Sequence, residues 1–123
     1  MPPRPEAPES PAPSAVEVGL QLLSGRWKPR LLWKLHLRDT WRFGELKRAL
    51  PGITPRMLTR QLRELEGDGL VRRRVYAVVP PRVEYSLSPF GRTLGPVFSA
   101  LDGWGEENRK EILQLLASWD EPA

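Results

Sequence analysis

The chain has 123 residues, 40% of them hydrophobic, which suits one domain with a modest core. It contains no cysteine and one histidine, His36, so disulfides, thiolate metal sites and thiol-based sensing by this chain are excluded. No apolar run reaches the roughly 18 residues of a membrane span, and the proline-rich, acidic N-terminus is unlike a secretory signal. We therefore expect a cytoplasmic protein with no membrane partner and no cofactor.

The net charge of +4 hides an uneven distribution. Residues 26–82 carry 15 Lys/Arg against 5 Asp/Glu, a net charge of +10, whereas residues 1–25 and 83–123 are net acidic. A basic middle between acidic ends favours one face adapted to a polyanion. An arginine-rich surface that is merely solvated gives the same pattern, so charge alone leaves both interpretations open.

The N-terminal part predicts an arm followed by two helices. Positions 1–13 hold six prolines and almost no apolar side chain, which favours a disordered or extended arm. Ser14 is an N-cap candidate for a short helix that ends at Ser24-Gly25. A second helix is expected over about 26–36, and Pro29 lies in its first turn, where a missing N–H is tolerated.

The middle of the chain predicts a short helix, a tight turn and a longer helix. Residues 41–43 have strand character, residues 44–50 read as a helix, and Pro51-Gly52 ends it. Thr54 is a good N-cap, with Pro55 at the favoured first helical position, and this helix is expected to run over 54–66. Glycines at 67 and 69 favour its end there.

Two strands and further helices complete the chain. Residues 70–79 and 83–88 are rich in β-branched side chains and flank Pro80-Pro81-Arg82, which predicts a hairpin with Arg82 at its tip. A long helix is expected from Ser88-Pro89, interrupted at Gly103 and Gly105, and an apolar face follows over 112–119. The order of elements predicts a mainly α winged helix-turn-helix over residues 14–119, with 120–123 as a tail.

The helix over 54–66 is the expected recognition helix. Leucines at 58, 62 and 65 recur at i, i+4 and i+7 and should face the core. At 100° per residue, the arginines at 56, 60 and 63 lie on the opposite side, with Thr59 beside them and Gln61 on the other flank. Arginine pairs with guanine or grips phosphate, so this face suits a DNA major groove. A merely charged, solvated helix face is the alternative.

The hairpin and the short helix add further basic candidates. Arg72 and Arg74 share one face of the first strand and Arg73 takes the other, and the sequence leaves open which face meets DNA. Arg82 is favoured as the wing contact, while Arg42 and Lys47 are either phosphate contacts or solvated. The predicted DNA-binding residues are Thr54, Arg56, Thr59, Arg60, Gln61, Arg63, Arg42, Lys47, Arg73, Arg74 and Arg82.

Several motifs resemble the HxlR-type family of bacterial regulators. They are LLSGRWKP at 22–29, RFGEL at 42–46, PGITPRMLTRQLRELEGDGL at 51–70 and VPPRVEYSLS at 79–88, with Gly91 and Trp104-Gly105 beyond. The resemblance covers about residues 14–105. It implies a MarR-like winged-helix repressor or activator that binds near-palindromic operators as a homodimer, with recognition helices about 34–36 Å apart.

The resemblance also implies dimerisation through the first helix and the C-terminal helices. Their apolar stripes exceed what one small domain easily buries, and the residues concerned are Val16, Leu20, Leu23, Leu94, Val97, Phe98, Leu101, Trp104, Ile112 and Leu116. Several family members sense oxidants through a cysteine near the N-terminus, where this chain has Ser14. The tryptophans could line a pocket for a small-molecule effector at the dimer interface.

The sequence favours one class of function over three others. The favoured one is a sequence-specific regulator that binds double-stranded DNA. A winged-helix protein–protein module and a non-specific DNA-binding protein are the alternatives, although such modules often lose the basic recognition face. An enzyme lacks the necessary parts, because there is no glycine-rich phosphate loop and no convincing carboxylate pair with a base.

Overall fold

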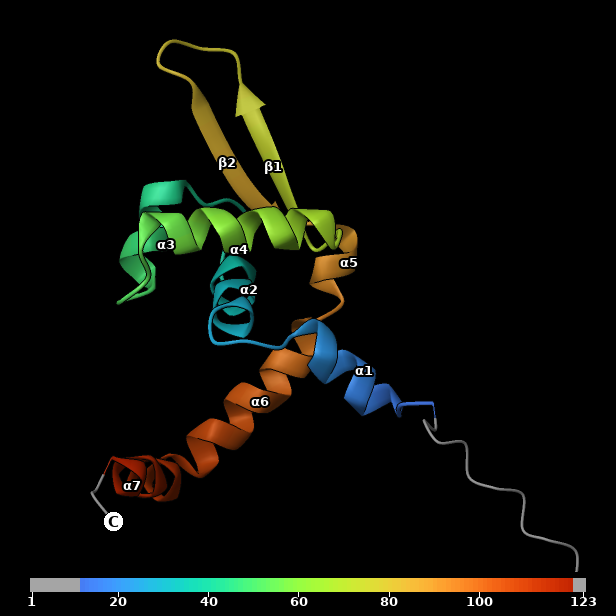
Figure 1. Cartoon of the computed structure of the whole chain (residues 1–123), viewed down its shortest axis with the longest axis vertical. Helices are drawn as coiled ribbons and strands as arrows, with labels where there is room; N and C mark the ends of the chain where they lie inside the picture. The colour runs from blue at the N-terminus through green and yellow to red at the C-terminus, as the bar shows by residue number, and fades with distance from the viewer. Residues whose placement is uncertain (1–11, 121–123) are drawn as a thin grey trace, which may run out of the picture.

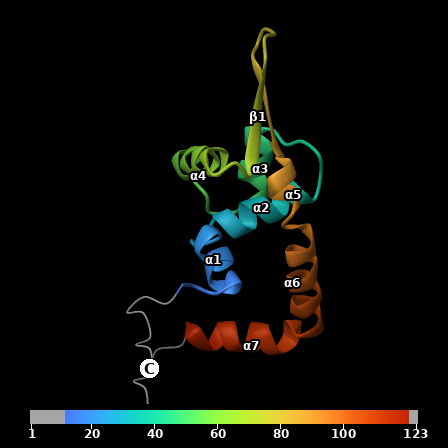
Figure 2. The same cartoon turned by 90° about the vertical axis from the view of Figure 1, so that its right-hand side faces the viewer.

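The structure is a computed structural model that describes residues 12–120, so most of the expected arm at 1–13 and of the tail at 120–123 lies outside the described residues. Helices α2 to α5 and the hairpin form one end of the molecule, and α1, α6 and α7 lie at the other (Figures 1 and 2). The elements are α1 (Ala15–Leu22), α2 (Lys28–His36), α3 (Phe43–Ala49), α4 (Pro55–Gly67), β1 (Val71–Tyr76), β2 (Arg82–Leu87), α5 (Pro89–Arg92), α6 (Gly95–Glu107) and α7 (Arg109–Trp119).

The core lies between α2, α3, α4 and the base of the hairpin. Leucines that are fully buried come from all three helices, and α4 contributes Leu58, Leu62 and Leu65, as the helical spacing predicted. Trp27 is also buried in this cluster. A stripe of this kind removes one whole face of α4 from water, which leaves the opposite face to the solvent.

The turn between α3 and α4 has the local chemistry that the sequence predicted. Gly52 adopts a φ of 92°, which favours glycine, and the N–H of Ile53 donates to the carbonyl of Leu50 at 3.1 Å. The hydroxyl of Thr54 accepts the N–H of Met57 at 3.1 Å and so caps α4. The buried Ile53 fixes the approach of the chain to the helix.

The hairpin is antiparallel and shorter than expected. Its pairing runs from Val71 opposite Leu87 to Tyr76 opposite Arg82, so residues 77–81 form the connection. Arg82 is therefore the first residue of β2 and not a tip residue. Only Trp41 of the expected strand at 41–43 pairs with β2, through a bridge to Tyr85, whereas Phe43 already begins α3.

The C-terminal helices divide at other points than expected. The predicted interruption at Gly103 and Gly105 is wrong, because α6 continues through both. Instead the helix that begins at Pro89 ends at Arg92, since Pro96 has no N–H to donate to the carbonyl four residues earlier. A second break falls at Asn108, between α6 and α7, and its side chain donates to the carbonyl of Trp104 at 2.9 Å.

Candidate nucleic-acid interface

The outer face of α4 carries three exposed arginines, Arg56, Arg60 and Arg63. Arg60 lies 3.8 Å from the carboxylate of Glu64, one turn later on the helix. The other oxygen of that carboxylate lies 3.5 Å from Nζ of Lys28, so α2 shares this acid with α4. Most of the positive charge on this face is therefore free to meet an anion.

The polar candidates on α4 are partly engaged within the helix. The hydroxyl of Thr59 donates to the carbonyl of Pro55 at 2.9 Å, and the hydroxyl of Thr54 is used in the cap. Gln61 is partly buried. The arginines thus supply the long side chains of this face, whereas the two threonines stabilise the first turns of α4.

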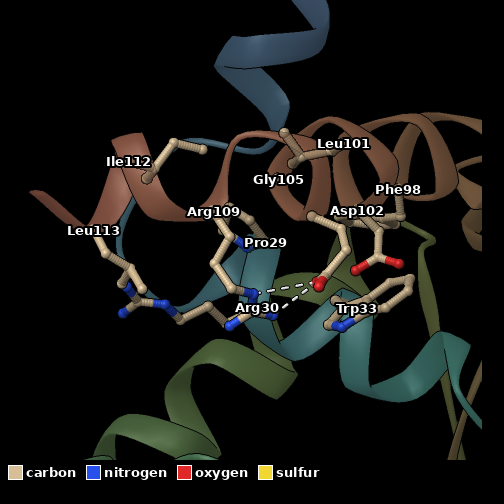
Figure 3. Close-up of a pocket in the computed structure, with 11 residues that line it drawn as sticks. Pro29, Arg30, Trp33, Phe98, Leu101, Asp102, Gly105, Arg109, Ile112 and Leu113 are labelled. Atoms are coloured by element: carbon tan, nitrogen blue, oxygen red, sulfur yellow. Dashed lines mark hydrogen bonds and ion pairs between the residues drawn. The ribbon is translucent and has the colours of Figure 1, made fainter. Parts of the chain in front are cut away.

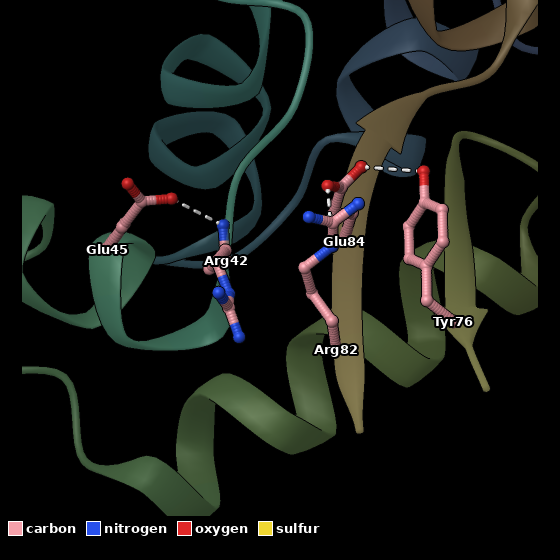
Figure 4. A network of polar contacts seen from close by, with 5 residues as sticks. All are labelled: Arg42, Glu45, Tyr76, Arg82 and Glu84. Atoms are coloured by element: carbon pink, nitrogen blue, oxygen red, sulfur yellow. Dashed lines mark hydrogen bonds and ion pairs between the residues drawn. The ribbon is translucent and has the colours of Figure 1, made fainter. Parts of the chain in front are cut away.

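Before and within α3, a carboxylate holds the chain beside more basic side chains. The N–H of Arg42 donates to Oε1 of Glu45 at 2.7 Å (Figure 4), and Arg38 pairs with the same oxygen at 3.1 Å. The N–H of Arg42 is the main cause that lowers the pKa of Glu45, and the nearby charges of Arg38 and Arg48 act in the same direction. The side chains of Arg42 and Lys47 remain exposed.

The two faces of the hairpin differ. Val71, Tyr85 and Leu87 are buried, which identifies the inner face, and burial raises the pKa of the Tyr85 hydroxyl. Arg73 belongs to this row by strand alternation, and its Nε lies 3.5 Å from the carboxylate of Glu66 near the end of α4. Arg73 therefore links the wing to the helix, whereas Arg72 and Arg74 lie on the outer face.

The outer face holds a compact polar cluster that sequence reasoning missed. The hydroxyl of Tyr76 donates to Oε2 of Glu84 at 3.2 Å, and Nε of Arg82 lies 3.4 Å from Oε1 (Figure 4). The guanidinium groups of Arg82 and Arg74 lie 4.3 and 4.8 Å from the centre of the Tyr76 ring. Only the strand register brings these residues together, and that register is not evident from the sequence.

The opposite end of the molecule exposes apolar side chains. Neither α1 nor α7 buries any residue. Of the predicted dimer residues, Leu23, Leu94 and Ile112 are half-buried. Phe98 is buried in the core of the single chain and packs against Trp33, so its side chain is not on the surface. The exposed members are Val16, Leu20, Val97, Leu101, Trp104 and Leu116, to which the structure adds Val18, Leu113, Leu115 and Trp119.

A groove of about 400 Å³ lies between α2, α6 and α7. Apolar side chains line it, among them Trp33, Leu101 and Ile112, and charged groups lie at its edge (Figure 3). Arg109 at this edge bonds to Glu106 at 2.9 Å. An apolar groove continuous with exposed apolar helices is typical of a surface that another chain covers.

A tight turn, an arginine-faced helix and a β-hairpin together define a winged helix-turn-helix protein of the transcription-regulator class. The model of the family described as HxlR-like helix-turn-helix matches residues 22–113, and the chain belongs to this family. No helix within residues 12–120 is long and apolar enough to cross a membrane.

Three known proteins show the closeness of this relationship. The uncharacterized HTH-type transcriptional regulator YybR of Bacillus subtilis (strain 168) is 54% identical over 104 residues, which span 84% of this chain and 81% of that protein. The solved structure of the redox regulator HypR in its reduced form has 50% identity and a TM-score of 0.75, over 82% of this chain and 99% of that chain. A MarR-family regulator from Porphyromonas gingivalis W83 has 39% identity and a TM-score of 0.74, over 80% and 96%.

Proposed function

We propose that this regulator binds double-stranded DNA sequence-specifically, as a homodimer on a near-palindromic operator. The observation that carries the proposal is the face of α4 opposite the core, where three exposed arginines stand with a single partly shared carboxylate among them. Arginine forms bidentate pairs with guanine in the major groove and also binds phosphate. In this proposal Arg56, Thr59, Arg60 and Arg63 enter the groove, flanked by Thr54 and Gln61.

The remaining basic candidates are assigned by their position. Arg42 and Lys47 contact phosphates beside the groove, and Arg74 and Arg82 contact the backbone or minor groove from the wing. Arg73 has a different part, because its ion pair with Glu66 ties the wing to α4. Its contribution to binding is then mainly to hold these two elements together.

The second part of the proposal is the dimer. Residues 14–119 would form the DNA-binding and dimerisation domain, in which α1, α6 and α7 cover one another across a two-fold axis. The exposed apolar side chains of these helices support this assignment, since a monomer rarely exposes so large a patch. A two-fold dimer places its recognition helices about 34–36 Å apart, one turn of DNA.

The biological setting follows from the partner. A protein that acts on the chromosome works in the cytoplasm at the nucleoid, and the proposal includes neither catalysis nor a cofactor. Because these 123 residues contain no cysteine, an effector or other signal would reach the protein by a route that uses no thiol of this chain.

The test is selection of bound fragments from genomic DNA at near-physiological salt, followed by footprinting of the recovered site. An inverted repeat with half-sites about one helical turn apart is the expected result. Fragments without a shared sequence would favour non-specific binding instead. Recovery of no DNA, together with capture of a protein partner, would favour the protein–protein module.

A further inference from the structure

Glu84 is the one carboxylate in residues 71–87, a segment that contains four arginines. Both of its oxygens have partners, because Oε2 accepts the Tyr76 hydroxyl at 3.2 Å and Oε1 lies 3.4 Å from Nε of Arg82. The side chain of Glu84 is 19% exposed and that of Arg82 is 46% exposed. The carboxylate is thus a fixed acceptor beneath a guanidinium that still reaches the solvent.

Positive charge surrounds this carboxylate on both sides. Arg74 is the direct partner of Glu84 in the strand register. Trp41 bridges Tyr85 on the other edge of β2, so the next residue, Arg42, lies beside Glu84 in an antiparallel arrangement. A negative charge at the centre of this basic surface opposes the approach of DNA phosphates.

Resting on the DNA-binding function proposed above, we infer that Glu84 limits the affinity of the wing for DNA by competing with DNA phosphate for the guanidinium of Arg82. Non-specific binding derives almost entirely from contacts with phosphates, so an occupied guanidinium weakens it directly. At an operator, where the wing also contacts the backbone, the same competition lowers the affinity by a similar factor. Glu84 thereby limits the overall affinity for DNA and not only the affinity for one sequence.

Tyr76 positions the carboxylate of Glu84 for its contact with Arg82. Its hydroxyl holds one carboxylate oxygen, and the two flanking guanidinium groups lie near its ring. This contact keeps the other oxygen directed at Arg82. The cluster therefore keeps Arg82 close to Glu84 until a DNA phosphate displaces the carboxylate.

The test is Glu84→Gln, which removes the charge but keeps an oxygen that can accept the Tyr76 hydroxyl. Affinity for DNA of random sequence is measured by fluorescence anisotropy across a salt series. One additional phosphate contact should steepen the slope of log K against log salt by about 0.9 and raise non-specific affinity about fivefold at 0.15 M salt. The affinity for the operator should rise by a similar factor, because the gained contact is with the backbone in both complexes.

Two further variants make the outcome specific. Glu111→Gln removes the same charge from α7, at the end of the molecule away from the wing (Figure 1), and should leave the slope unchanged. Because Arg82→Ala removes a contact by itself, Glu84→Gln is also compared in the Arg82→Ala background, where it should give no gain over Arg82→Ala alone. A gain that persists there would overturn the competition for Arg82, because the charge alone would then explain it.

The failure of this inference is separable from that of the proposed function. If the wild-type protein binds operator DNA but Glu84→Gln leaves slope and affinity unchanged, the assignment of Glu84 alone is wrong. If the wild-type protein binds no DNA, both are overturned. Thermal melting of each variant, with a Tm equal to that of the wild type, shows that altered affinity does not come from loss of fold.

Discussion

Gly91 of α5 faces the backbone carbonyl oxygen of Leu70, at the junction where the wing returns to the helices. A Cβ at position 91 would overlap that oxygen and would lie 3.1 Å from Cδ2 of Leu87. The same carbonyl accepts the N–H of Ser88 at 3.0 Å, and the hydroxyl of Ser88 accepts the N–H of Gly91 at 2.9 Å. The two ends of the hairpin are thus joined by hydrogen bonds, and α5 approaches them so closely that position 91 has no room for a side chain.

Gly91→Ala should therefore destabilise the protein. We expect a loss of about 1–3 kcal/mol in the free energy of unfolding, because the new methyl group must displace backbone. Urea denaturation measures this loss. Gly67→Ala in α4 is the control: nothing lies within 4 Å of its position, so its stability should be unchanged or slightly raised. Equal stability of the two variants would contradict the close approach.

Arg60→Ala should weaken operator binding by about 1–3 kcal/mol if the side chain contacts a base. Anisotropy measurements with the selected operator and with single-base variants check this, since specificity should relax at one position only. Lys110→Ala on α7 is the control and should bind as the wild type does. An unchanged Arg60→Ala affinity would show that α4 does not read the groove at this residue.

Leu20→Lys should shift the protein from dimer to monomer, because a lysine on the exposed apolar face of α1 would have to be buried against the second copy. Sedimentation velocity at micromolar concentration gives the assembly state. Leu37→Lys is the matched control, since Leu37 is also exposed but lies outside α1, α6 and α7. A wild-type protein that sediments as a monomer would reject the dimer itself.

The cap of α3 should give an acid-dependent part of the stability. The folded pKa of Glu45 is lowered below its ordinary value of 4.5, chiefly by the N–H of Arg42. Its stabilisation is therefore present above that value and is lost as the pH falls through the lowered folded pKa. Wild type should melt at a higher temperature than Glu45→Gln at pH 7, and the difference should shrink at pH 3. A constant difference would contradict the ionised cap.

Local signals explain why α4 could be predicted closely. Thr54 and Pro55 specify the start of a helix through hydrogen bonding within one turn, and the leucine spacing specifies its buried face. The pairing of Tyr76 with Glu84 and Arg82 could not be predicted in the same way, because the register depends on how many residues the connection takes.

In the C-terminal region, glycine and proline affect the helices to different degrees. Glycine inside a helix costs about 0.5–1 kcal/mol but leaves the hydrogen bonds intact, so α6 continues through Gly103. Pro96 removes a donor and was the stronger signal. The apolar stripe also could not separate Phe98, which packs inside the chain, from Leu101, which faces outward, because both follow the same helical spacing.

The closed base of the hairpin has a mechanical consequence. Each strand has six residues, so the connection at 77–81 stands roughly 20 Å from the Leu70–Ser88 junction at about 3.3 Å per residue. Over that length, a tilt of about 5° at the base would carry the far end about 2 Å, more than half the length of a hydrogen bond. The rigidity of the backbone at Leu70 and Ser88 thus determines how precisely the connection at 77–81 is positioned.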